Sequence, residues 1–131
     1  KPILGNVVGR ITAAVWREAI DLVLQGVIDV DDLDRAVSLG PALGWAAAGP
    51  YLTYHLSAGD EGFGQFLQHL NKTFESVWGD LATWSRLDPE QRHALIHTVE
   101  RTYEGKLATI REARDRRLAA ILRGLEDASE K

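Results

Sequence analysis

Nine apolar side chains that recur at helical spacing constrain the fold of this chain more than any other feature. They are Phe63, Phe66, Leu67, Leu70, Phe74, Val77, Trp78, Leu81 and Trp84. Steps of three and four place side chains on one face of an α-helix, so the spacing predicts a long amphipathic helix with Asp60 as its N-cap. We expect the apolar face to be buried, because each large side chain gains roughly 1.5–3 kcal/mol on leaving water.

Two shorter helical patterns precede this stripe. Apolar residues at helical spacing predict a first helix over residues 10–25, and Gly26 follows where a left-handed C-cap is needed. Asp29 is expected to cap a second helix that runs to about Leu39. Further aspartates in the first turn of that helix would stabilise it, because their negative charge interacts favourably with the positive end of the helix dipole.

Prolines mark where the next elements begin and end. Gly40-Pro41 is expected to stop the second helix and open a loop, and Gly49-Pro50 predicts a short third helix that ends near Ala58-Gly59. Asp88-Pro89-Glu90-Gln91 has the pattern of a capping box, so another helix should start there. Its periodicity continues toward the charged tail, broken or weakened at Gly105.

The fold class expected from these patterns is all-α, with five to six helices in a single domain over residues 1–131. No segment shows sustained alternation of period two, and no internal repeat is evident. The apolar faces are wide enough that one copy would leave a face uncovered. A homodimer is therefore the expected way to cover it.

Charge and hydropathy exclude several classes of partner. A formal net charge of -4 argues against a surface that neutralises phosphates, so nucleic acid is not an expected partner. No apolar run reaches the roughly 18–20 residues that span a bilayer, and the first residues lack a signal-peptide pattern. We therefore expect no membrane association and a cytoplasmic location. The chain contains no Met, which indicates a processed or excised piece.

Metal chemistry has little support in the composition. The absence of cysteine removes thiolate nucleophiles and thiolate zinc sites, leaving His and carboxylates as possible ligands. His93 and His97 have the four-residue spacing of a zinc pair. They lack a glutamate directly after His93 and an obvious third ligand, so an exposed helix face is the favoured interpretation. We expect no metal site.

The segment from Gly5 to Ala19 carries a family resemblance. It reads GNVVGRITAAVWREA and resembles the opening of the C-terminal domain of the 3-hydroxyacyl-CoA dehydrogenase family. In that family a Gly-Phe-[Val/Ile]-x-Asn-Arg turn leads into a helix with Glu-Ala at its middle. The resemblance continues through Glu18-Ala19, Leu22-Val23, Gly26-Val27, Asp31-Asp32-Leu33-Asp34, Ala36, Gly40 and Gly49-Pro50-Tyr51. Thr53-x-His55-Leu56-Ser57 and the Arg114–Leu118 run are similar to the branch containing L-gulonate 3-dehydrogenase and carnitine dehydrogenase.

The resemblance implies a two-domain oxidoreductase of which this chain is the second half. An N-terminal Rossmann domain would bind NAD and carry the catalytic His–Glu pair. The helical C-terminal domain, of the 6-phosphogluconate dehydrogenase C-terminal-like type, would dimerise and close over the substrate. This chain has no Gly-x-Gly-x-x-Gly turn, so we expect the Rossmann domain to be missing and NAD to be bound elsewhere. The implied reaction oxidises a 3-hydroxy group of an acyl-CoA, as in fatty acid metabolism, or of a 3-hydroxy acid. The isolated domain should be inactive.

Two positions depart from the family pattern. Gly9 stands where the family has an Asn that lies near the reacting oxygen, and Leu52 replaces the Glu that usually follows the Gly-Pro turn. Asn6 lies too early in the turn to replace the missing amide. We therefore assign no catalytic residue to this chain.

Four residues are candidates for substrate binding. Arg10 can meet a carboxylate or phosphate with its planar fork, or form a structural ion pair. His55 would lie nearest a substrate cleft, against the alternative of an ordinary helix histidine. Trp45 and Tyr51, with Tyr54, could line an acyl channel or pack in the core or dimer interface. Arg111–Arg117 interleaves acids and bases, which favours an exposed helix face over a phosphate site.

A second function hypothesis remains open. The chain could be a free-standing helical protein that associates with itself or with a partner and has no catalytic role. Gly9 and Leu52 favour this interpretation, because both lack the polar groups that enzyme members carry. The N-terminal pattern favours the dehydrogenase domain.

Overall fold

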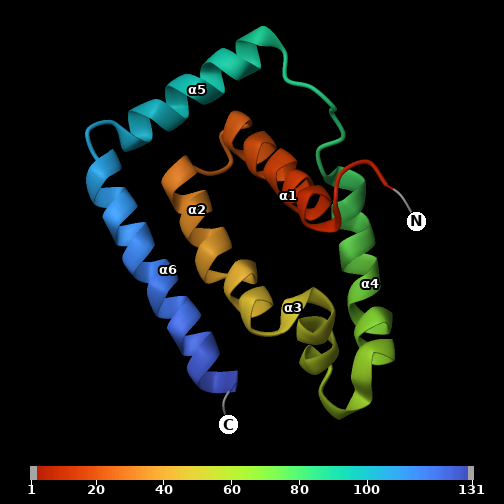
Figure 1. The fold of residues 1–131 in the computed structure, drawn as a ribbon. Helices are drawn as coiled ribbons and strands as arrows, with labels where there is room; N and C mark the ends of the chain where they lie inside the picture. The colour runs from red at the N-terminus through yellow and green to blue at the C-terminus, as the bar shows by residue number, and fades with distance from the viewer. Residues whose placement is uncertain (1–2, 130–131) are drawn as a thin grey trace. The chain divides into compact units, whose positions relative to one another are not determined.

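The computed structural model describes residues 3–129, which are entirely helical apart from turns and connections (Figure 1). The helices are α1 (Val7–Leu24), α2 (Val30–Leu39), α3 (Pro41–Ser57), the 3₁₀ turn η1 (Gly59–Glu61), α4 (Gly62–Asp80), α5 (Pro89–Tyr103) and α6 (Leu107–Ser129). The all-α class is confirmed. Counting η1, the described residues hold seven helices, slightly more than the five to six predicted. Within these residues, no helix is both long and apolar enough to cross a bilayer.

The chain divides into two compact units, with the boundary between Leu95 and Ile96 inside α5. The first unit contains α1 to α4, in which α2 packs against α1 and α3, and α3 packs against α4. The second unit holds the end of α5 and all of α6. The assignment of residues 1–131 to a single domain stays a prediction.

The core of the first unit is small. Its buried apolar residues are Ala19, Ile20, Val30, Leu33, Phe66 and Ala82. An aromatic cluster extends it between α3 and α4, where the ring of Phe66 lies 4.9 Å from Tyr54 and 6.1 Å from Phe74, centroid to centroid. The Phe74 ring in turn stacks on Trp78 at 5.7 Å. The tilted contact of Phe66 with Tyr54, and the edge-on contact of Phe74 with Tyr54, stabilise the α3–α4 pair beyond simple burial of area.

The predicted long helix is shorter, and its face is less buried, than the stripe suggests. α4 ends at Asp80, so Leu81 and Trp84 lie in the connection that follows rather than in the helix. Within α4, Phe66 is buried, but Trp78 keeps 58% of its surface exposed, and Leu67, Leu70 and Val77 are also exposed. The expectation of a fully buried stripe is therefore wrong for this chain taken alone.

The segment after Pro41 is helical, which corrects the expected loop. Pro41 occupies the first turn of α3, where its missing N–H needs no partner. α3 kinks at Gly49, whose φ of 70° and ψ of 166° are open to glycine alone among common residues. Pro50 follows the kink, and the Thr53 hydroxyl donates to the Gly49 carbonyl at 2.7 Å. Each proline therefore starts a helical stretch, and the second starts where the short third helix was predicted.

The start of α4 also differs from the prediction. Asp60 lies inside η1 and not at the cap position. The Phe63 N–H instead donates to Nδ1 of His55 at 3.1 Å, so a histidine near the end of α3 satisfies an amide in the first turn of α4. Gly62, with a φ of 73°, makes the sharp turn between them.

The local signals around α5 and α6 were interpreted correctly. The Gln91 N–H donates to Asp88 Oδ1 at 2.8 Å, and the Asp88 N–H donates to Gln91 Oε1 at 3.1 Å, which is a complete capping box. α5 ends at Tyr103, and Gly105, with a φ of 70°, separates it from α6. The described residues of α6 include none that is buried, and Leu107, Ile110, Leu118, Ile121, Leu122 and Leu125 are all exposed.

We predict that Phe74→Asp unfolds or strongly destabilises the first unit. The variant removes ring contacts with Tyr54, Phe66 and Trp78 and places a charge among them. The expected loss is about 3 kcal/mol or more, as for other removals of large apolar side chains. Thermal unfolding followed by circular dichroism and gel filtration would measure it. The neighbouring exposed Thr73→Asp serves as the control, and an unchanged melting temperature and elution volume for Phe74→Asp would contradict the prediction.

Candidate functional site

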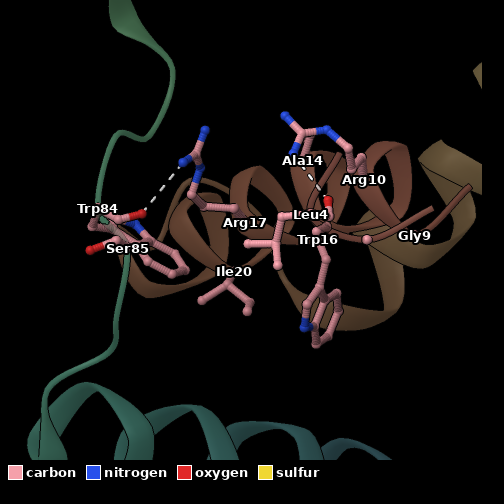
Figure 2. A pocket seen from close by; sticks show the side chains of 11 residues that line it. Leu4, Gly9, Arg10, Ala14, Trp16, Arg17, Ile20, Trp84 and Ser85 are labelled. Atoms are coloured by element: carbon pink, nitrogen blue, oxygen red, sulfur yellow. Dashed lines mark hydrogen bonds between the residues drawn. The ribbon is translucent and has the colours of Figure 1, made fainter. Parts of the chain in front are cut away.

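An open cavity of about 570 Å³ lies against the first half of α1 and the connection after α4 (Figure 2). The residues around it are Leu4, Gly5, Gly9, Arg10, Ala13, Ala14, Trp16, Arg17, Ile20, Trp84 and Ser85. All of them belong to the first unit. Ligand cavities typically measure about 300–1,000 Å³ and combine apolar walls with a few polar groups, which is also the composition here.

The N-terminus of α1 fixes one end of this cavity. Asn6 is the N-cap, and its side-chain oxygen accepts the Gly9 N–H at 2.6 Å. Gly5, with a φ of 73°, turns the chain into the helix. A Cβ added at Gly9 would lie 3.2 Å from the Asn6 side-chain oxygen, which is a tight contact. The cap therefore fits best with no side chain at position 9.

Three hydrogen bonds attach the connection after α4 to α1. Glu18 accepts the Ala82 N–H at 2.9 Å, and Asp21 accepts the Trp84 indole N–H at 2.8 Å. Arg17 donates to the Trp84 carbonyl over a longer distance of 3.5 Å. Both carboxylates therefore bind neutral donors, and the second of them fixes the ring of Trp84 at the edge of the cavity. We call these bonds the α1 clamp.

Two arginines line the cavity from the same side of α1. Arg10 and Arg17 are seven positions apart, which is about two helical turns, and Figure 2 shows both guanidinium groups extending to one side of the helix. Arg10 donates to the Leu4 carbonyl at 3.3 Å. Across the described residues, neither arginine has a carboxylate within ion-pair distance. The cavity therefore carries positive charge in a chain of net negative charge.

The four predicted substrate-binding residues are not brought together. Of the four, Arg10 alone lines this cavity. Trp45, Tyr51 and His55 lie on α3, where Trp45 is half-buried and Tyr51 is 80% exposed. The Tyr51 ring meets Phe63 edge-on at 6.4 Å, and His55 accepts the Phe63 amide. Their role in substrate binding stays a prediction.

Two residues of the cavity escaped the sequence analysis. Arg17 was not singled out, although it repeats Arg10 after two turns and follows an exposed Trp16. Trp84 was assigned to the helical stripe, because its spacing continues that of α4. The periodicity of α1 gave a usable signal for Arg17, whereas nothing local identifies Trp84.

The part of the chain that the structure describes contains no set of metal ligands. Among the side chains that the structure describes, no three or more His, Asp or Glu groups are placed to hold an ion. Exposed ion pairs among the described side chains join Arg35 to Asp31, Arg114 to Asp115, and Arg116 to Glu112. Such pairs contribute little to stability.

Comparison with known proteins points to one family. The model of the 3-hydroxyacyl-CoA dehydrogenase C-terminal domain matches residues 5–94. L-carnitine dehydrogenase of Nocardiopsis dassonvillei is 36% identical over 124 residues, which are 94% of this chain and 37% of that enzyme. The L-carnitine dehydrogenases of Streptomyces coelicolor and Pseudomonas putida are 34% and 30% identical, over 91% and 98% of this chain and 37% and 40% of theirs. The chain thus spans about two fifths of the length of these curated relatives.

We predict that Asp21→Ala loosens the α1 clamp. The variant leaves the half-buried Trp84 indole N–H without its charged acceptor, and such a loss costs about 1–3 kcal/mol. Urea unfolding would measure the stability, and the indole N–H signal of Trp84 in a nitrogen-15 correlation spectrum should shift. Asp31→Ala, which breaks only an exposed pair with Arg35, is the control and should cost less than about 0.5 kcal/mol. Equal losses in the two variants would argue against the clamp.

Proposed function

Because the chain belongs to the 3-hydroxyacyl-CoA dehydrogenase family, whose C-terminal domain it matches, we propose that it is the substrate-binding and dimerisation domain of an NAD-dependent dehydrogenase. The parent enzyme would oxidise a 3-hydroxy group to a 3-keto group. The observation that carries the proposal is the alignment of nearly the whole chain with about two fifths of each L-carnitine dehydrogenase.

The proposed substrate is a 3-hydroxy acid. The relatives are named for L-carnitine, which has a hydroxyl group on carbon 3 and a free carboxylate. The cavity on α1 supports this choice, because it offers, next to apolar walls, two guanidinium groups that form no ion pair with any described residue. An acyl-CoA thioester, which lacks the free carboxylate, is the less favoured member of the same substrate class.

The proposed division of work leaves the redox chemistry to the rest of the parent enzyme. NAD, when bound, accepts the hydride from carbon 3. This sequence has no Gly-x-Gly-x-x-Gly turn to hold its phosphates, so NAD is proposed to bind the rest of the parent enzyme. This chain would orient the acid through Arg10 and exclude water with the apolar wall of α1. Trp45, Tyr51 and His55 are proposed to contact the substrate from α3. Gly9 offers no side-chain donor, so this chain contributes no catalytic residue.

Dimerisation is the second part of the proposal. Exposed apolar side chains follow α6 at helical spacing from Leu107 to Leu125. Isolated exposed apolar residues are common on soluble proteins, but a continuous apolar face typically marks a surface to which a partner binds. A second copy of the chain is the proposed partner, and the cytoplasm is the proposed location of the assembled enzyme.

A chimera tests the enzymatic part. The chain would be joined in frame to the N-terminal three fifths of the Nocardiopsis dassonvillei enzyme, and NADH formation would be followed with L-carnitine as substrate. We expect NAD-dependent turnover by the chimera and none by the 131-residue chain alone. The same N-terminal part without a C-terminal domain is the control. A folded chimera that binds NAD but turns over neither L-carnitine nor other 3-hydroxy substrates would overturn the proposal.

Sedimentation velocity tests the dimer. The chain is expected to sediment as a dimer at micromolar concentration, and Leu118→Asp should convert it to a monomer, because a carboxylate would be placed on the apolar face of α6. Arg116→Asp introduces the same carboxylate on the exposed face of α6, in place of an exposed pair with Glu112, and should leave the dimer intact. A monomeric wild-type chain at all concentrations, or dimerisation unaffected by Leu118→Asp, would count against this surface.

A further inference from the structure

We propose that Arg17 is the residue that binds the substrate carboxylate, with Arg10 adding a second positive charge to the same subsite. This inference rests on the proposed function and adds to it a specificity-determining residue that holds the acid group. The cavity on α1, described above, would seat the acid with its carboxylate at the arginine side and its carbon chain along the helix (Figure 2).

The first support is the bonding state of Arg17. A guanidinium group has five N–H donors in a planar fork, and within the described chain Arg17 uses one nitrogen, in a long bond to the Trp84 carbonyl. The side chain is half-buried, so its charge is partly desolvated. A partly buried guanidinium that lacks an ion pair gains more from a carboxylate than an exposed one does, because water screens the interaction less.

The second support is that the nearest acids on α1 are already engaged. Glu18 and Asp21 follow Arg17 by one and four positions, and either could have paired with it. Both accept N–H groups of the connection after α4 instead, at 2.9 and 2.8 Å. In the described structure neither acid therefore forms an ion pair with Arg17, whose guanidinium lies beside Trp84 (Figure 2).

The remaining walls favour a carboxylate over a phosphate. The side-chain donors that line the cavity are the two guanidinium groups, the indoles and the Ser85 hydroxyl, and there is no Lys among the lining residues. The Gly9 amide at the N-terminus of α1 is taken by Asn6. Ala13, Ala14 and Ile20 supply a smooth apolar wall. An Arg fork can bind either anion, but a carboxylate brings a carbon chain that the apolar wall can cover, whereas a phosphate would lack further donors here.

A titration of the 131-residue chain tests the inference without cofactor or turnover. The probe is sodium 3-hydroxybutyrate, compared with its uncharged methyl ester, at constant ionic strength. The indole N–H signals of Trp16 and Trp84 in a nitrogen-15 correlation spectrum report binding, because both residues line the cavity. The acid should shift them saturably and the ester should not. Arg17→Gln should weaken the binding about tenfold or more, as expected for the loss of a charged hydrogen-bonding partner.

Matched variants separate binding from folding. Arg35→Gln removes the same charge from α2, outside the cavity, and should leave the affinity for the acid unchanged. Arg17→Lys keeps the charge but not the fork, and should recover part of the affinity. The unfolding temperature of each variant shows whether the fold is retained.

Several results would overturn the inference. They are the absence of saturable shifts with the acid, equal shifts with acid and ester, undiminished binding by a folded Arg17→Gln variant, or tighter binding of inorganic phosphate than of the acid. The outcome is independent of the chimera. If the chimera is active but the Arg17→Gln variant binds the acid as well as wild type, the role of Arg17 is rejected and the proposed function stands. If the folded chimera is inactive but the acid binding depends on Arg17, the proposed function is rejected and the acid-binding site stands.

Discussion

The α1 clamp is the interaction on which the arrangement of the first unit depends. Its hydrogen bonds join Glu18 and Asp21 to residues 64 and 63 positions later in the chain. Because the core around them is small, hydrogen bonds to charged acceptors are important for holding the connection after α4 in place. The clamp also closes the wall of the cavity, because it fixes the ring and the carbonyl of Trp84 beside Arg17. The same hydrogen bonds thus hold the connection after α4 against α1 and position Trp84 in the wall of the cavity.

Sequence patterns predicted the local features of the fold and missed those that depend on residues far apart in the chain, such as the clamp. The capping box at Asp88 and Gln91 is local and was predicted from neighbouring residues, whereas at Gly105 the sequence left a break or a weakening open and the structure shows a break. The end of α4 was missed, because Leu81 and Trp84 continue the helical spacing and the carboxylates that bind their segment lie on α1. The loop expected after Pro41 was wrong for another reason: the same proline both ends one helix and occupies the first turn of the next.

The site was predictable only in part. Arg10 was found through the family resemblance, and the structure places it in the cavity. Arg17 needed the helical geometry, which puts residues seven apart on one side, together with the knowledge that Glu18 and Asp21 are bound elsewhere. His55 was chosen from the family resemblance, and Trp45 and Tyr51 as aromatic side chains that could line a channel; neither signal tells which helix a side chain will face. His55 illustrates this, since its ring accepts the amide that opens α4.

The cap at the start of α1 has an evolutionary consequence. Asn6 turns its side chain onto the backbone of Gly9, and the space for a side chain at that position is narrow. A side chain at position 9 would meet the Asn6 side chain, so the effect of a substitution at position 9 depends on which residue stands at position 6. The two positions are therefore coupled: one substitution at the cap changes which residues the next turn of α1 accepts.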